Sequence, residues 1–275
     1  MSDKDGLLTD KFSEKITSVC GGTPAAVADA RPLVHLLTNY VTVTDCVNAL
    51  LAVGARAICS HAPQEAAEVC AASDALVCNL GGTEYYESMD LAAAEALRRG
   101  IPLVIDPVGC SASTYRREKC LRMIADYRPA AVRGNYAEIT SLIEGHSEGG
   151  GLDSDSALSD ESEHGLKSSM LTFAGEHQLI LIASGAVDLC TDGNDFVEVS
   201  RGTPALKRIT GAGCMSSALL GAFLAADRSL ASAVGLQRFV ALCGEAAVDA
   251  CRKSGLGAGH FHTYFMDALS AVMPL

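Results

Sequence analysis

Short apolar runs alternate with longer segments of helical periodicity along most of the chain. The longer segments repeat their apolar residues every three or four positions, and many are rich in alanine. The short runs are rich in branched residues and lie at residues 33–37, 56–59, 75–79, 103–105, 130–132 and 179–183. This alternation predicts repeated βαβ units, and therefore an α/β fold with a mostly parallel central sheet flanked by helices on both faces.

Capping residues mark the ends of several predicted helices. Residues 45–54 follow two possible N-caps, Thr42 and Thr44, and end at Gly54, so they predict a helix. Another helix is predicted to end at Gly100, because Arg98 and Arg99 supply the basic last turn that favours a helix C-terminus.

The pattern changes after residue 183. Asp192-Gly193 lies between two alternating runs and predicts a hairpin, which adds antiparallel strands to one edge of the sheet. Three helices are then expected, at residues 212–226, 230–251 and 263–273. The sequence has no internal repeat and no second core, so residues 1–275 are predicted to form a single domain.

One segment, residues 146–166, differs from the rest of the chain. It contains six carboxylates, several serines and a triple glycine. This composition predicts an acidic surface loop, because it offers little apolar surface to bury.

Charge and cysteine content exclude several classes of protein. The net charge of −12 and the absence of a basic run argue against nucleic acid as a partner. The eleven cysteines lie within apolar runs without any C-x-x-C pair, so we interpret them as reduced, buried residues rather than zinc ligands. No apolar run approaches the ~20 residues of a membrane span, and the first residues form no apolar signal stretch. We therefore expect a soluble, cytoplasmic protein without a membrane partner.

Polar residues directly follow the predicted strands, at the edge where an open α/β sheet binds its ligands. Arg133 directly follows a buried strand and could bind a phosphate group. Asn135 and Glu138 have two equally good interpretations, because the carboxylate could hold a hydrated magnesium ion or complete a capping box. The other residues at these positions are Thr38-Asn39, Ser60-His61, Asn79, Gly81-Gly82, Asp106 to Gly109 and Ser184-Gly185.

The stretch Thr210-Gly211-Ala212-Gly213-Cys214 precedes a predicted helix. The free N–H groups of a helix N-terminus attract anions, and glycines allow an anion to approach the backbone closely. The stretch is therefore a candidate for holding a transferred phosphoryl group, although a tight turn packed against the sheet would have the same composition.

Five motifs occur in an order that resembles the hydroxyethylthiazole kinase family of thiamin salvage, within the ribokinase-like superfamily. They are PLVHLLTNYV, LVIDPVG, AAVRGNYAEI, the Ser-Gly-x-Val-Asp that follows residue 183, and ITGAGC. The resemblance extends from about Pro32 to the C-terminal helix. It implies a kinase that transfers the γ-phosphate of ATP, with Mg²⁺, to the primary hydroxyl of 4-methyl-5-(2-hydroxyethyl)thiazole. It also implies a homotrimer with active sites at the subunit interfaces.

The same resemblance implies roles for individual residues. The phosphoryl group would be transferred at Gly211, Ala212, Gly213 and Cys214. Arg133 and Ser184 would contact ATP, and Glu138 and Asp106 would organise magnesium and its waters. The thiazole would be bound by Asn39, Val41, Cys59 and Gly211.

Cys214 stands where most ribokinase-like kinases have an aspartate base, and members of the resembled family share this cysteine. Because phosphoryl transfer depends mainly on positioning and charge stabilisation, a strong base is dispensable. We expect the helix N-terminus to lower the pKa of the thiol somewhat, so that it could act as a weak base or orient the hydroxyl.

The chain departs from the family pattern at Cys59, where methionine is usual, and at Ser184, where threonine is usual. A second glycine, in Leu80-Gly81-Gly82-Thr83, is also unusual.

The same motifs are compatible with two rival functions. One is a kinase for another small alcohol, such as hydroxymethylpyrimidine or a sugar, and the other is a nucleotide-binding sensor without catalysis.

Overall fold

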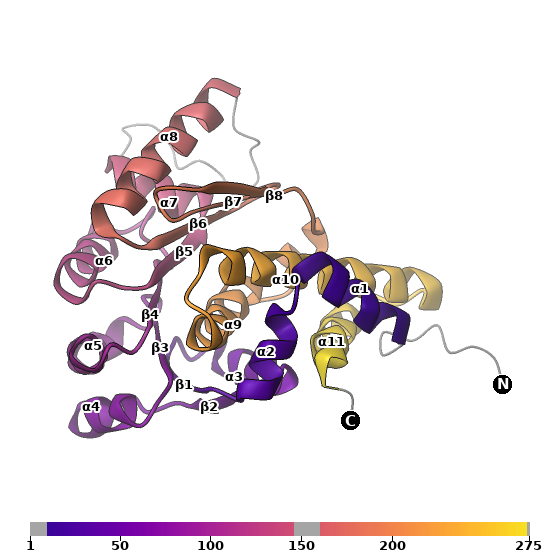
Figure 1. Cartoon of the computed structure of the whole chain (residues 1–275), viewed down its shortest axis with the longest axis horizontal. Helices are drawn as coiled ribbons and strands as arrows, with labels where there is room; N and C mark the ends of the chain where they lie inside the picture. The colour runs from indigo at the N-terminus through magenta and orange to yellow at the C-terminus, as the bar shows by residue number, and fades with distance from the viewer. Residues whose placement is uncertain (1–9, 146–159, 274–275) are drawn as a thin grey trace.

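The computed structural model describes residues 10–145 and 160–273, and its centre is an eight-stranded sheet (Figure 1). The strands are arranged in the order β2-β1-β3-β4-β5-β6-β7-β8. The first six are parallel, and the hairpin of β7 and β8 is antiparallel at the edge next to β6, as the sequence predicts. Their bounds are β1 Leu33–Leu37, β2 Arg56–Ile58, β3 Ala75–Asn79, β4 Leu103–Asp106, β5 Ala131–Asn135, β6 Ile180–Ser184, β7 Asp188–Thr191 and β8 Phe196–Val199.

The strand register brings polar residues side by side at the carboxyl edge of the sheet. Asn79, the last residue of β3, is paired with Asp106, the last residue of β4. On the other side of β4, Asn135 at the end of β5 is paired with Ser184 at the end of β6. Residues far apart in sequence therefore meet at one edge, because all of these strands end there.

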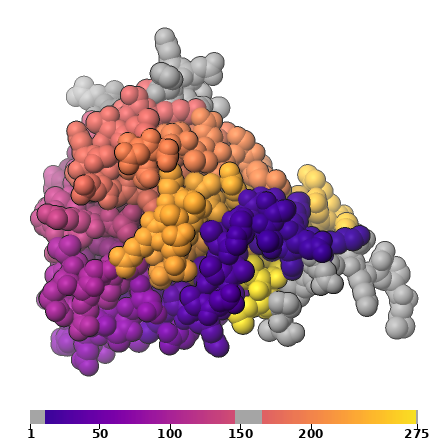
Figure 2. All heavy atoms as spheres, in the orientation of Figure 1, coloured from indigo at the N-terminus to yellow at the C-terminus, as the bar shows by residue number. Residues whose placement is uncertain are grey.

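One face of the sheet is covered by helices from both ends of the chain (Figure 1). Helix α9 lies against β1, β3 and β4, and every residue from Met215 to Leu224 is buried. Gly221 allows this close packing, because a Cβ there would lie 2.5 Å from the Val77 side chain of β3. In Figure 2 the N-terminal helices lie against α10. The helices of this layer are α1 Asp10–Cys20, α2 Thr23–Ala30, α3 Val43–Ala52, α9 Ala212–Ala226, α10 Leu230–Ser254 and α11 Ala258–Leu269.

The opposite face is covered by helices from the middle of the chain, which enclose a second apolar cluster. They are α4 Pro63–Ala71, α5 Tyr86–Arg99, α6 Thr114–Tyr127, α7 Tyr136–Glu144 and α8 Asp160–His177. Three short 3₁₀ helices complete the connections, at Thr83–Tyr85, Pro204–Arg208 and Ser270–Val272.

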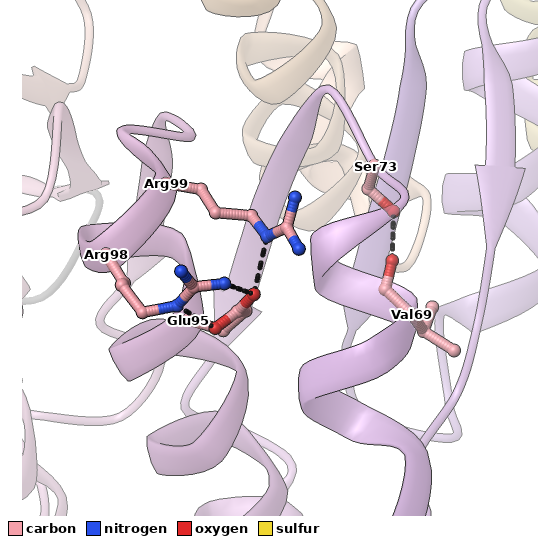
Figure 3. A network of polar contacts seen from close by, with 5 residues as sticks. All are labelled: Val69, Ser73, Glu95, Arg98 and Arg99. Atoms are coloured by element: carbon pink, nitrogen blue, oxygen red, sulfur yellow. Dashed lines mark hydrogen bonds and ion pairs between the residues drawn. The ribbon is translucent and has the colours of Figure 1, made fainter.

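The end of α5 illustrates how capping residues set a helix boundary (Figure 3). The Glu95 carboxylate accepts hydrogen bonds from Arg98 at 2.6 Å and from Arg99 at 2.5 Å. Gly100 then adopts a left-handed conformation with φ 68°, and its N–H binds carbonyls of the last turn. Next to α5, the Ser73 hydroxyl donates to the Val69 carbonyl at 2.8 Å, just after α4 ends. The predicted stop at Gly100 is confirmed.

The boundaries predicted for the acidic loop and for the last two helices are wrong. Helix α10 ends at Ser254 rather than at residue 251, and α11 ends at Leu269 rather than at residue 273. Residues 160–166 of the predicted acidic loop form the first turns of α8, and Leu166 is buried with Met170 in the second cluster. The other part of that loop, residues 146–159, lies outside the described residues. The last helix begins at Ala258 rather than near residue 263, since the left-handed Gly255 ends α10 and the extended Gly257 is already the N-cap of α11.

Within residues 10–145 and 160–273, no helix is both long and apolar enough to cross a membrane. All eleven cysteines are free thiols, and eight of them are buried, in agreement with their interpretation as small core residues.

Candidate active site

The candidate site lies where the carboxyl ends of the parallel strands meet the N-terminus of α9. Gly211, the N-cap residue, has φ 82°, and a Cβ there would lie 2.7 Å from the Thr42 side chain. Glycine is therefore required at this position for both its conformation and its contact with the loop after β1. Gly213 is exposed and has room for a Cβ, whose nearest atom would be Arg133 Nη1 at 3.6 Å. The first N–H groups of α9 thus lie on an accessible surface with the positive end of the helix dipole.

Cys214 is held by amide groups from two strand ends. Asn79 Nδ2 donates to Cys214 Sγ at 3.2 Å, and Asn39 Nδ2 donates to the same sulfur at 3.7 Å. The Asn79 amide also donates to Asp106 Oδ2 at 2.8 Å. One side chain therefore connects the thiol of α9 with the carboxyl group at the end of β4.

The pKa of the Cys214 thiol is raised to about 11, so the expected lowering by the helix N-terminus is wrong. The largest cause is burial, which disfavours the thiolate, and the negative charge of Asp106 adds to it. Hydrogen bonds from Thr42, Asn79 and Asn39 act in the opposite direction but are weaker. The thiol is therefore neutral at physiological pH.

Asp106 and Glu138 form a pair of neighbouring buried carboxyl groups. Asp106 is 3% exposed, and its pKa is raised to about 7, first by burial and then by the charge of Glu138. Arg133 counteracts this shift without cancelling it. Burial raises the pKa of both carboxyl groups, and the charge of Glu138 raises that of Asp106 further. Such a pair is suited to a divalent cation, because bound positive charge would favour the ionised forms.

Glu138 also completes the capping box of α7. Its Oε2 accepts the Asn135 N–H, and Asn135 Oδ1 accepts the Glu138 N–H, both at 2.9 Å. Its Oε1 accepts the Gly109 N–H at 2.9 Å, which fixes the loop after β4. The capping interpretation of this pair is therefore confirmed. Each carboxylate oxygen keeps a further lone pair, so the magnesium interpretation remains a prediction.

Arg133 is a buried cation beside the N-terminus of α9. It is 6% exposed, and its Nη1 donates to the Gly213 carbonyl at 3.2 Å. Its Nε has no hydrogen-bond partner among the described residues. A guanidinium with an unsatisfied donor next to free helix N–H groups is an arrangement that a phosphate can complete.

Ser184 lies one strand away from Arg133 and points to the same region. Its hydroxyl donates a hydrogen bond at 3.1 Å to the carbonyl of Gly134, the residue that follows Arg133 in the sequence. The two residues predicted to contact ATP thus lie on adjacent strands, β5 and β6.

The residues predicted to bind the thiazole occupy the opposite side of the site, after β1 and β2. Asn39 Oδ1 accepts hydrogen bonds from the Val41 N–H at 3.1 Å and from the Thr42 N–H at 3.2 Å, which shapes the loop after β1. Val41 is 60% exposed, and Cys59, which follows β2, is also exposed. The structure therefore brings Asn39 into contact with Cys214, while Val41 and Cys59 are exposed on the loops that follow β1 and β2.

Sequence reasoning gave no role to Asn79 and treated Thr42 only as a helix cap. Thr42 does precede α3, but its hydroxyl donates to Asn39 Oδ1 at 3.2 Å instead of capping the helix. The strand-end position of Asn79 placed it among the candidate residues at this edge, but its contacts with both Cys214 and Asp106 depend on the order of the strands in the sheet.

Comparisons with known proteins agree with these motifs. The chain matches the model of the Hydroxyethylthiazole kinase family over residues 25–274. It is 35% identical over 250 residues to the hydroxyethylthiazole kinase of Methanocorpusculum labreanum, which covers 90% of both chains. It is 37% identical over 250 residues to that of Nitratidesulfovibrio vulgaris, again 90% of both chains.

Solved structures show the same relationship. A hydroxyethylthiazole kinase protein from Pyrococcus horikoshii superimposes with a TM-score of 0.78 at 30% identity, over 94% of this chain and 93% of that one. A ribokinase-like superfamily protein from Enterococcus faecalis gives a TM-score of 0.60 at 11% identity, over 88% of this chain and 89% of that one. The second likeness is one of fold alone, and it confirms the ribokinase-like architecture.

Proposed function

Because the chain belongs to the hydroxyethylthiazole kinase family, we propose that it transfers the γ-phosphoryl group of ATP to the primary hydroxyl of 4-methyl-5-(2-hydroxyethyl)thiazole, a step of thiamin salvage. The observation that carries the proposal is the arrangement around the N-terminus of α9. There the Cys214 thiol is connected through Asn79 to Asp106, and the Arg133 guanidinium, with one donor unbonded, contacts the first turn of the helix.

The phosphates of ATP would bind on the side of β5 and β6. Arg133 supplies a fixed positive charge, and Ser184 supplies a hydroxyl on the neighbouring strand. The N–H groups of Ala212 and Gly213 would stabilise the charge that develops on the transferred group, since they point outward from the start of α9. Catalysis in this arrangement comes from positioning and from fixed dipoles.

Asp106 and Glu138 would hold Mg²⁺, partly through water and through the phosphates themselves. When bound, the ion neutralises charge on the β- and γ-phosphates. The raised pKa of Asp106, to about 7, has a direct consequence for this role, because the carboxyl group is only partly ionised at neutral pH before a cation binds.

The thiazole would bind on the side of β1, between Asn39, Gly211 and the exposed rim residues Val41 and Cys59. Its hydroxyl would then lie near Cys214. A neutral thiol that accepts two amide hydrogens can orient the hydroxyl by a hydrogen bond, but it cannot remove a proton efficiently.

A homotrimer with active sites at its subunit interfaces is part of the proposal. Tyr40 and Val41 support it, because they are 77% and 60% exposed directly beside Asn39. Large apolar side chains at such exposure beside a site favour cover by another subunit. Sedimentation of Tyr40→Glu should reveal dissociation, while the control Leu97→Glu, at an exposed position on α5, should sediment as the native protein does. A native protein that sediments as a monomer would contradict the trimer.

The reaction fits the cytoplasm, where ATP is available and thiols stay reduced. The rival interpretation as a nucleotide sensor can be separated by one assay. We expect ADP release, measured in a coupled assay with ATP and Mg²⁺, to depend on added thiazole. A protein that binds ATP but releases no ADP in the presence of thiazole would be a sensor.

A further inference from the structure

Asn79 uses all of its hydrogen-bonding capacity within the site. Its Nδ2 donates to Asp106 Oδ2 at 2.8 Å and to Cys214 Sγ at 3.2 Å. Its Oδ1 accepts from Asn39 Nδ2 at 3.2 Å and from the Gly81 N–H at 3.0 Å. A side-chain amide offers two donors and two acceptor lone pairs, so no further partner is available or needed.

These four contacts connect four separate parts of the fold. Asn79 ends β3, while its partners belong to the loop after β1, the loop after β3, the end of β4 and the start of α9. Because Asn79 is 1% exposed, water cannot replace a lost contact. The orientation of its amide is also fixed, since Asp106 requires the donor side and the Gly81 N–H requires the acceptor side.

We propose that Asn79 is a positioning residue that holds Cys214 and Asp106 in register for phosphoryl transfer; this inference rests on the proposed function. Asn79 acts through its partners. It keeps the sulfur facing Asn39 and the strand ends, and it keeps the carboxyl group of Asp106 turned toward the same point. Displacement of reacting groups by about 1 Å can cost ~100-fold in rate, so the loss of this connection should act on turnover more than on ATP binding.

Asn79→Leu is the most informative substitution, because it preserves side-chain size and removes all four hydrogen bonds. We expect kcat to fall ~100-fold, with a much smaller change in the KM for ATP, since Asn79 is bonded to Asp106 but not to Arg133 or Ser184, the residues proposed to contact ATP. Asn79→Gln provides a second variant, in which the amide is kept but displaced by one methylene. It should fold and should also lose kcat selectively.

A control matched in burial is available in Gln237, another amide, which lies on α10 and is 2% exposed. Its Nε2 has no hydrogen-bond partner among the described residues, so Gln237→Leu removes a buried amide whose nitrogen holds no other group in place. Its kcat should remain native even if its melting temperature changes. A general effect of losing a buried amide is thereby separated from a specific effect on the site.

The decisive measurement is a double-mutant cycle with Cys214→Ala. If Asn79 acts partly through the thiol, adding Cys214→Ala to Asn79→Leu should cost no further kcat, whereas Cys214→Ala alone lowers it. Independent, multiplying losses would overturn the proposal, as would native kcat in folded Asn79→Leu or Asn79→Gln. The same cycle on melting temperature, without substrate, should also be non-additive. The melting-temperature cycle tests the role of Asn79 even if the protein does not phosphorylate the thiazole. An error in the proposed function would instead appear as a native protein without kinase activity.

Discussion

Replacing Cys214 with alanine removes the group that stands in the position of a catalytic base, and the structure indicates that the cost is modest. The pKa of the thiol is raised to about 11, chiefly by burial. At pH 7 the thiolate fraction is therefore on the order of 10⁻⁴. A base present at that fraction would contribute little, whereas a hydrogen bond from a neutral thiol is available at all times. We expect Cys214→Ala to retain about a tenth of the native kcat, compared with the ~10²–10⁴-fold typical of a true general base.

The pH dependence of kcat distinguishes the two roles more sharply. If the thiolate were the base, kcat would rise about tenfold per pH unit between pH 8 and pH 10, because ionisation increases as the pH approaches about 11. A hydrogen-bonding thiol predicts a nearly flat profile in this range. Cys214→Asp should also be active, because the amides of Asn39 and Asn79 can donate to a carboxylate as they do to sulfur.

The assay is initial-rate kinetics of thiazole phosphorylation from pH 7 to pH 10 for the native protein and both variants, with circular dichroism as the check of folding. The positioning role would be refuted if log kcat of the native protein rose with a slope of one against pH and if folded Cys214→Ala lost more than ~10³-fold in kcat.

Three further results are expected. The folded-state pKa of Asp106, about 7, lies above its unfolded value of ~3.9, so its contribution to stability is present below ~3.9 and lost as the pH rises through about 7. Asp106→Asn should thus raise the free energy of unfolding in urea by up to about 4 kcal/mol at pH 8 but should not raise it at pH 3. The same substitution should abolish turnover. An unchanged free energy of unfolding at pH 8 would contradict the raised pKa of Asp106. Arg133→Met should raise the KM for ATP or lower kcat at least ~100-fold without changing thiazole affinity measured calorimetrically, whereas native ATP kinetics would make Arg133 purely structural. Leu166→Ala should lower the unfolding free energy by about 2–5 kcal/mol, far more than Leu97→Ala on the surface, and equal losses would contradict its place in the core.

The fold was predictable wherever periodicity and caps agreed. The helix at residues 212–226 was predicted with its observed bounds, because glycines precede it and Asp227 follows a continuous apolar segment. The first turns of α8, residues 160–166, were not predicted. Their mixed polarity resembles that of a loop, and the sequence alone does not show that Leu166 is buried with Met170. Only tertiary packing decides such a segment.

The site was predictable in its residues but not in its electrostatics. Strand ends identify the polar groups that share an edge, and this was enough to find Asn39, Asp106 and Arg133. The pKa of Cys214 could not be inferred, because a helix N-terminus lowers it and burial beside Asp106 raises it. Which effect is larger depends on how completely the surrounding loops exclude water. The fourfold bonding of Asn79 likewise depends on strand order, which places β3 between β1 and β4.

A competition experiment shows which alcohol the protein phosphorylates. The native protein is incubated with ATP, Mg²⁺ and equal concentrations of 4-methyl-5-(2-hydroxyethyl)thiazole and hydroxymethylpyrimidine, and the phosphorylated products are resolved by mass spectrometry. We expect thiazole phosphate to be formed in large excess, with one ADP for each phosphate transferred. Predominant pyrimidine phosphate, or ADP without a phosphorylated alcohol, would contradict this expectation.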